Sequence, residues 1–159
     1  MATKSIRPID SKAEKLLCAL EYVSPHVLRP HPGNARTHNR RQRRALKASI
    51  RRFGFRQPIL ARKDGQIVAG HERVEASKEL SLKEIPVIWI ENLSEDEIRA
   101  YVIADNKIAQ LAGWDKELLA TELQFLVEVG FDLEPIGFEA PEVDLLIESV
   151  GELACTRFG

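Results

Sequence analysis

The pattern of apolar and polar residues predicts short strands in the first part of the chain and only helices after them. Four segments have the length and the apolar or alternating character of strands: 18–24, 57–62, 66–70 and 84–90. Asp64 and Gly65 separate the second segment from the third, and this pair of residues favours a hairpin turn. The fourth segment, EIPVIWI, is apolar enough to be a central strand.

Helical periodicity accounts for most of the remaining chain. Five segments carry apolar residues three and four positions apart: 39–53, 71–80, 94–109, 114–129 and 143–150. Asn39 or its neighbour is expected to cap the first helix, with Gln42 at the capping-box position and Gly54 just after the last residue of the helix. Residues 94–97 read as a capping box for the third helix. The apolar stripe of the first helix, which is expected to be buried, consists of Leu46, Ile50 and Phe53.

This order of elements predicts an α+β fold, in which a small mixed β-sheet is packed with helices and an acidic helical part follows. We expect a flexible N-terminus over residues 1–15, a sheet-containing domain over 16–110, and a helical C-terminal extension over 111–159. A length of 159 residues suits one domain with an appended piece.

Charge is distributed very unevenly along the chain. The formal net charge is only −1, but residues 1–90 carry 19 Lys/Arg against 8 Asp/Glu, a net of +11. Residues 91–159 carry 4 against 16, a net of −12. The stretch 29–63 has 12 Lys/Arg and no acid. Such a run favours a polyanion partner, and the alternative is that the two oppositely charged parts attract each other.

Other features exclude several classes of protein. The chain has no apolar stretch of the roughly 18 residues that a membrane span needs, and its first 15 residues lack the apolar core of a secretory signal. We therefore expect a cytoplasmic protein without a membrane partner. Cys18 and Cys155 have no Cys or His at metal-ligand spacing, so they read as reduced thiols.

One short stretch, DGQIVAGHERVEASKEL, places ionisable residues where a strand passes into a helix. Its apolar run stops at Gly70, and His71, Glu72 and Arg73 follow before the helical pattern begins. The start of a helix attracts anions, a glycine lets the backbone approach a ligand, and Arg73 can fork onto phosphate oxygens. The alternative is that Arg73 pairs with Glu72, Glu75 or another surface acid.

Five segments in order resemble the N-terminal domain of ParB-type proteins, in the ParB/sulfiredoxin superfamily and of the type associated with phage and plasmid methyltransferases. They are NAR (34–36), SIRRFGF (49–55), QPILAR (57–62), DGQIVAGHER (64–73) and IPVI (85–88). The resemblance covers about residues 18 to 110 and implies a ParB/sulfiredoxin-like fold.

The resemblance also implies a ligand, a nucleoside triphosphate (ATP or CTP) with Mg²⁺. Its phosphates would lie on the turn at residues 70–73, and Asp105 with Asn106 resembles the pair that holds the divalent ion. The residues implied to contact the nucleotide are Arg36, Gln57, Pro58, Gly70, His71, Arg73 and Asn106.

The chain departs from three branches of this superfamily. Partition proteins that hydrolyse CTP carry arginines where Glu75 and Ala109 stand here, so two cations are missing. Sulfiredoxins need a catalytic cysteine at the position of His71, which excludes that activity. Free-serine kinases carry an aspartate where Ala69 stands, which makes such a kinase the less favoured enzyme.

The part after residue 90 contains only four basic residues: Arg99, Lys107, Lys116 and Arg157. Because a reading helix needs cations against DNA phosphates, we expect no helix-turn-helix module with a basic recognition helix here. Segments 103–123 and 130–138 instead resemble ParB-like domains that are often fused to DNA methyltransferases. The resemblance therefore suggests a methyltransferase or another DNA-processing protein as partner, and it leaves a homodimer open.

These observations favour a DNA-associated, nucleotide-binding module whose basic helix touches the DNA backbone. The expected DNA contacts are Arg40, Arg43, Arg44, Lys47 and Arg51. The alternative is a metal-dependent nuclease or NTPase, with His71 as general base and Glu72 or Asp105 on the metal. A third interpretation is a protein-interaction module in which the acidic helices of residues 94–150 dock a partner or mimic DNA.

Overall fold

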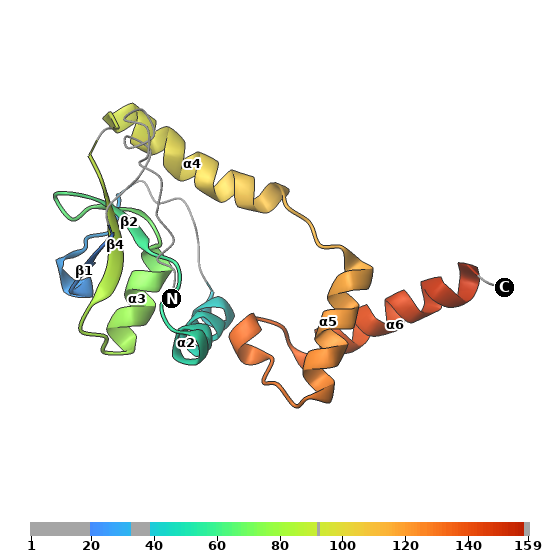
Figure 1. Cartoon of the computed structure of the whole chain (residues 1–159). Coiled ribbons are helices and arrows are strands. Elements are labelled where there is room, and N and C mark those ends of the chain that lie inside the picture. The colour runs from blue at the N-terminus through green and yellow to red at the C-terminus, as the bar shows by residue number, and fades with distance from the viewer. Residues whose placement is uncertain (1–19, 33–38, 92, 158–159) are drawn as a thin grey trace, which may run out of the picture.

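The computed structural model describes residues 20–32, 39–91 and 93–157, with side chains up to residue 151 (Figure 1). The elements in chain order are β1 (Leu20–Val23), η1 (Pro25–Val27), α2 (Arg40–Phe53), β2 (Ile59–Arg62), β3 (Ile67–Ala69), α3 (His71–Glu79), β4 (Ile85–Ile90), α4 (Glu95–Leu111), α5 (Lys116–Glu128), η2 (Glu134–Ile136) and α6 (Ala140–Arg157). None of these helices is both long and apolar enough to cross a membrane.

The sheet has four strands in the order β1-β4-β2-β3. β4 is central, as its composition predicts, and pairs antiparallel with β1 and parallel with β2. β2 and β3 form the expected hairpin, in which the Gly65 N–H donates to the Arg62 carbonyl at 2.8 Å. The prediction of an α+β fold with a small mixed sheet is therefore confirmed.

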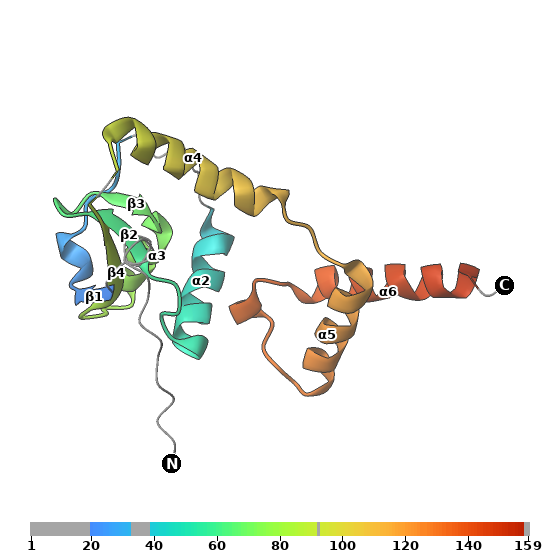
Figure 2. The same cartoon turned by 45° about the horizontal axis from the view of Figure 1, so that its top comes forward.

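Helices cover both faces of this sheet. Ile67 of β3 belongs to one apolar cluster with Val74 of α3, whereas the next residue, Val68, belongs to another cluster with Ile98 and Val102 of α4. Successive strand residues point to opposite faces, so α3 and α4 pack on opposite sides of the sheet. Figure 2 shows α4 running across the edge of the sheet unit and leading away from it toward α5.

Helix α2 differs from its prediction, because none of its residues is buried. Leu46 and Ile50 are half-buried, and Phe53 is 38% exposed. The reason is the position of α2, which contacts α3 and η2 rather than the sheet (Figure 2). The Phe53 ring instead stacks on the ring of Phe131, with 6.2 Å between the centroids. The expected Asn39 cap is present, since its side-chain oxygen accepts from the Gln42 N–H at 2.7 Å.

Helices α5 and α6 form a second group with buried residues of their own, whereas η2 contacts α2. Ala120 and Leu123 of α5 and Val143 of α6 are buried, and α5 packs against α6. α6 spans 18 residues, which is longer than the predicted 143–150. The extension includes Pro141, which a helix tolerates in its first turn, and Gly151, which does not end the helix.

The capping box predicted at the start of α4 is present and makes α4 sensitive to acid. The Glu97 carboxylate accepts from the Ser94 N–H at 2.7 Å, and this bond is the main cause that lowers the pKa of Glu97. A lowered carboxyl pKa contributes stability that is present above the ordinary glutamate pKa, about 4.3, and is lost as the pH falls through the lowered value.

We expect Glu97→Ala to destabilise the protein at neutral pH and to lose most of this effect in strong acid, where wild-type Glu97 is protonated. Urea unfolding at several pH values measures the difference, and Asp96→Ala removes an acid from the same turn outside the capping box. A Glu97→Ala effect that stays constant across this pH range would contradict the assignment.

Candidate functional site

A cavity of about 270 Å³ lies where α2, α4 and the turn between β3 and α3 meet. Its lining residues are Gln42, Leu46, Gln57, Val68, Ala69, Gly70, His71, Glu72, Arg73, Val102, Asp105 and Asn106. The structure thus brings most of the predicted site residues to one place, although they come from segments far apart in the sequence. Arg36, also predicted for this site, lies outside the described residues.

The turn that opens α3 requires a glycine. Gly70 is the N-cap residue, has φ 100°, and accepts the first helical hydrogen bond from the Val74 N–H at 3.1 Å. A Cβ at this position would lie 2.7 Å from Cδ1 of Ile59 and 3.0 Å from Nη2 of Arg73. The backbone therefore packs directly on a core side chain and on the arginine, with the positive end of the α3 dipole at the cavity.

Arg73 is held in a fixed orientation by the segment before β2. Its Nη1 donates to the Gln57 side-chain oxygen, and its Nη2 lies 3.4 Å from the Pro58 carbonyl oxygen. The two acids considered as alternative partners are bound by other cations, because Glu72 accepts from Arg43 and Glu75 accepts from Lys78. The guanidinium of Arg73 is thus a positioned donor group at the cavity wall.

His71 and Glu72, the two residues predicted to be catalytic, both make specific hydrogen bonds. Nε2 of His71 accepts from the His31 backbone N–H at 3.1 Å, which places the proton of a neutral ring on Nδ1. The Glu72 carboxylate accepts from Nε of Arg43 at 2.9 Å and from Nη2 at 3.1 Å. This bidentate bond is the main cause that raises the pKa of Arg43. Both side chains therefore connect the turn to neighbouring segments.

Asp105 and Asn106 face the turn from α4. The Asp105 side chain is exposed, while Asn106 is half-buried and donates from its amide to the Val102 carbonyl at 2.7 Å. Carboxylate and amide oxygens are ligands that suit Mg²⁺. Within the described chain, no three His, Cys, Asp or Glu side chains come together to hold a metal ion. An ion at this pair would therefore complete its shell with phosphate oxygens and water.

Sequence reasoning missed the contribution of α2 to the cavity. Gln42 and Leu46, four residues apart and so on one face of α2, both line it. The sequence pattern indicates only a capping role for Gln42. The signal that identifies both residues is the ion pair between Arg43 and Glu72, which brings this face of α2 to the turn.

The five predicted DNA contacts of α2 fall into three groups. Arg43 and Lys47 pair with acids of α3, with Lys47 Nζ 2.6 Å from Glu79 Oε2. Arg44 pairs across to Glu134 of η2 at 2.8 Å. Arg40 and Arg51 are exposed and form no ion pair among the described residues. The alternative that the two oppositely charged parts attract each other thus has direct contacts in its favour.

Two family models match the chain. The ParB N-terminal domain model matches residues 10–107, and a ParB-methyltransferase HTH domain model matches residues 117–155. The second match shows that a helix-turn-helix family unit follows the sheet, while the expectation concerned a module with a basic recognition helix, and residues 117–155 contain no Lys or Arg. That expectation rested on charge, whereas a family match reflects the helical framework, and the shortage of basic residues in this region remains.

Individual proteins are similar to about half of the chain. The ParB-like nuclease domain-containing protein YnaK of Escherichia coli is 40% identical over 85 residues, which are 54% of this chain and 95% of that protein. A probable plasmid-partitioning protein ParB of Thermus thermophilus is 36% identical over 96 residues, 55% of this chain and 32% of that protein.

A solved structure extends the similarity to most of the chain. It is the C-terminally truncated chromosome-partitioning protein ParB from Caulobacter crescentus complexed with CTP-gamma-S, with a TM-score of 0.68 and 25% identity. The match covers 81% of this chain and 77% of that one. Since one family model alone covers more than half of the residues, the chain belongs to the ParB N-terminal domain family.

Proposed function

We propose that this chain is a DNA-associated ParB-like module that binds the phosphate groups of a nucleotide at the Gly70–Arg73 turn. The observation that carries the proposal is the convergence, in one cavity, of the α3 N-terminus, the positioned Arg73 guanidinium and the Asp105–Asn106 pair. Helix N-termini and forked arginines are the groups that proteins use for phosphate. The similarity to a ParB complexed with a CTP analogue supports the same assignment.

The residues present fit the phosphate part of a nucleotide. Gly70 packs its backbone directly on Ile59 and Arg73, since a Cβ there would lie 2.7 Å from Cδ1 of Ile59, and this packing fixes the α3 N-terminus beside the guanidinium. A volume of about 270 Å³ is slightly below the roughly 300–1,000 Å³ typical of small-molecule pockets. We therefore assign the cavity to the phosphates and place base recognition beyond it.

Mg²⁺ bound at Asp105 and Asn106 would neutralise part of the phosphate charge. This neutralisation matters more here than in CTP-hydrolysing partition proteins, because Glu75 and Ala109 stand where those proteins carry arginines. Gln57 would act as a positioning residue, because its side-chain oxygen orients Arg73. CTP is the first nucleotide to test, given the solved relative, and ATP the second.

An enzymatic role is the second candidate, and it rests on the name of YnaK as a ParB-like nuclease domain protein. The hydrogen bonds of the two predicted catalytic residues weigh against it. His71 Nε2 already accepts from a backbone N–H, and both oxygens of Glu72 accept from Arg43. A general base or a metal ligand at these positions would first have to give up those bonds.

The DNA-binding part of the proposal rests on α2 and on family membership. Arg40 and Arg51 are exposed on α2, and Arg44 is exposed beside its ion-pair partner. Contacts of this kind neutralise phosphates without reading bases, so the affinity should fall steeply with salt. The expected partners are DNA and, by the family match of residues 117–155, a DNA methyltransferase system.

Calorimetric titration with CTP and ATP in the presence of Mg²⁺ tests the nucleotide site. Arg73→Ala is expected to weaken binding at least about 100-fold, because two charge-assisted hydrogen bonds at about 1.5–3 kcal/mol each would be lost. Lys78→Ala removes the same charge from the last turn of α3 and should bind like wild type. The proposal fails if wild type binds neither nucleotide, or if both variants bind equally well.

A further inference from the structure

The helix-turn-helix family match and the chemistry of the matched residues point in different directions. Residues 117–155 contain ten Asp/Glu and no Lys, Arg or His. A helix-turn-helix unit that reads DNA neutralises phosphates with cations around its recognition helix. This unit would repel DNA instead, so a partner that binds its polar face must be positively charged.

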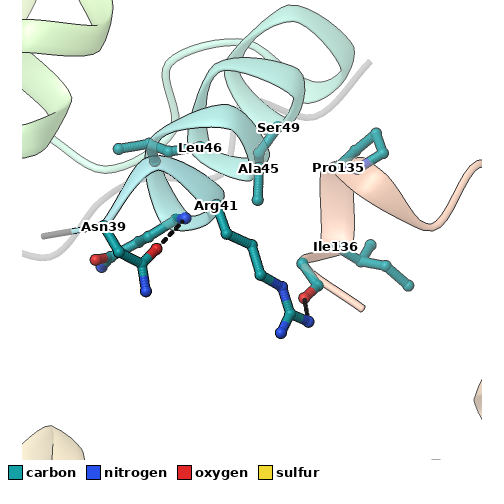
Figure 3. Close-up of a pocket in the computed structure, with 9 residues that line it drawn as sticks. Asn39, Arg41, Ala45, Leu46, Ser49, Pro135 and Ile136 are labelled. Carbon is teal, nitrogen blue, oxygen red and sulfur yellow. Dashed lines mark hydrogen bonds between the residues drawn. The ribbon is translucent and has the colours of Figure 1, made fainter. Parts of the chain in front are cut away.

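A positively charged surface lies directly against the unit, on the outer side of α2. Three ion pairs join them: Arg41 Nε to Glu139 Oε1 at 3.0 Å, Arg41 Nη2 to Glu142 Oε2 at 2.7 Å, and Arg44 Nε to Glu134 Oε1 at 2.8 Å. Figure 3 shows Arg41 reaching from α2 to the chain after η2, where its Nη2 also lies 3.4 Å from the Gly137 carbonyl oxygen.

Contacts of aromatic rings add to these ion pairs, but the border of the interface remains open to solvent. Phe131 stacks on Phe53, and the Arg52 guanidinium lies 5.0 Å above the Phe131 ring. Two cavities of about 460 Å³ each border the contact, and both are lined by Arg41 and Ala45. Both hollows are open to solvent and none of the α2 residues is buried, so the segment can separate from α2 without loss of a dense core.

The arginines on the two sides of α2 are held to different degrees. Arg43 points to the inner side and is itself 41% exposed, but it is bound to Glu72, whose side chain is only 12% exposed, against 42–51% for the acids that bind Arg41 and Arg44. Arg41 and Arg44 point outward, with side chains 48% and 66% exposed. Exposed ion pairs contribute little free energy and are weakened by salt. The outer pairs therefore exchange readily, and phosphate offers arginine the same forked geometry as carboxylate.

We propose that the acidic segment 131–142 competes internally with nucleic acid for α2. Its carboxylates Glu134, Glu139 and Glu142 occupy Arg41 and Arg44 in the way that DNA phosphates would. DNA reaches these two arginines only when the segment leaves α2. The helix-turn-helix family unit thus blocks DNA binding by the neighbouring basic helix and does not bind DNA itself. This inference rests on the DNA-binding part of the proposed function.

Two charge-matched triple variants of the full chain test the competition. The contact variant is Glu134→Gln, Glu139→Gln and Glu142→Gln, and the control variant is Glu122→Gln, Asp144→Asn and Glu148→Gln. Each variant removes three negative charges from the same unit, but the control acids are exposed and form no ion pair within the described chain. Fluorescence anisotropy with a labelled random-sequence duplex, measured over a series of salt concentrations, gives the affinity and its salt dependence.

We expect the contact variant to bind DNA about tenfold more tightly than the control variant at low salt, because two arginines become available. The slope of log affinity against log salt should steepen by about two, since each additional phosphate that the protein neutralises adds nearly one unit. Adding Arg41→Ala and Arg44→Ala should abolish this increase in the contact variant, because the two arginines that the segment releases are then missing.

The outcomes separate the two proposals. Equal DNA affinities and salt slopes for the two triple variants would leave the DNA-binding proposal intact. They would contradict the proposed competition between segment 131–142 and DNA. If no protein binds the duplex even at low salt, the DNA-binding part of the proposed function fails, and the competition fails with it. The nucleotide site is tested independently of both outcomes by calorimetry.

Discussion

Gly70→Ala is expected to destabilise the protein by about 2–5 kcal/mol. An alanine in the left-handed region costs about 1–2 kcal/mol, and forcing an extra carbon against a packed core costs about 1–3 kcal/mol more. Both costs apply here, because Gly70 has φ 100° and its Cβ would lie 2.7 Å from Cδ1 of Ile59. The second close neighbour is Arg73 Nη2, so the substitution should also weaken nucleotide binding.

Ile59→Val separates the two costs, because it removes the Cδ1 atom that the new Cβ would meet. Ile59→Val alone should cost about 0.5–1.5 kcal/mol, since Ile59 is fully buried. In its presence Gly70→Ala should cost only the backbone part, about 1–2 kcal/mol. Urea unfolding of the four proteins gives this double-mutant cycle.

Gly113→Ala is the matched control, because a Cβ there meets no atom within 4 Å. It should change stability by no more than about 0.5 kcal/mol. If Gly70→Ala behaves like Gly113→Ala, the turn is not constrained as described. If the effects of Gly70→Ala and Ile59→Val on the free energy of unfolding are strictly additive, the strain at residue 70 lies in the backbone alone.

Leu123→Ala is expected to unfold the C-terminal helices while the sheet remains folded. Leu123 is 2% exposed, and truncation of such a leucine costs about 2–5 kcal/mol. The core around it is small, with Ala120, Pro135 and Val143 as the other buried residues in this region of the described chain. A core of this size provides only a few kcal/mol, so the loss should exceed the stability of the unit.

Hydrogen exchange measured by peptide mass spectrometry tests this expectation. Amides of α5 and α6 should lose protection in Leu123→Ala, while those of β2, β4 and α3 keep it. Leu118→Ala truncates the same side-chain type on the same helix at a site that is 59% exposed, and should leave protection unchanged. Loss of protection throughout the sheet would show that the proposed division near residue 110 is not a boundary between separately stable units.

The sequence predicts the fold well because its local signals agree with one another. The Asp64–Gly65 turn, the capping residues Asn39 and Ser94, and the apolar segment 84–90 each specify one element, and all four appear where expected. The prediction fails where the outcome depends on tertiary placement. The amphipathic periodicity of α2 indicates an apolar face. It does not indicate that α2 contacts η2 and α3 instead of the sheet.

The candidate site is predictable where its residues are adjacent in sequence, and it is missed where folding brings them together. The Gly70–Arg73 turn is a local signal, so the sequence indicates it directly. The roles of Gln42 and Leu46 depend on how α2 is held beside the turn, which the sequence pattern does not encode. Likewise, charge alone suggests that Arg44 meets DNA, whereas folding places Glu134 beside it.

The way α2 is held has a consequence for how such a module can evolve. This helix forms one wall of the cavity, yet none of its residues is buried, and its contacts with α3 include side-chain ion pairs from Arg43 and Lys47. Substitutions in this wall therefore alter the ligand site without disturbing the hydrophobic core that keeps the sheet folded. Substitutions on α2 can therefore change the ligand specificity of the cavity during evolution with little effect on the stability of the sheet.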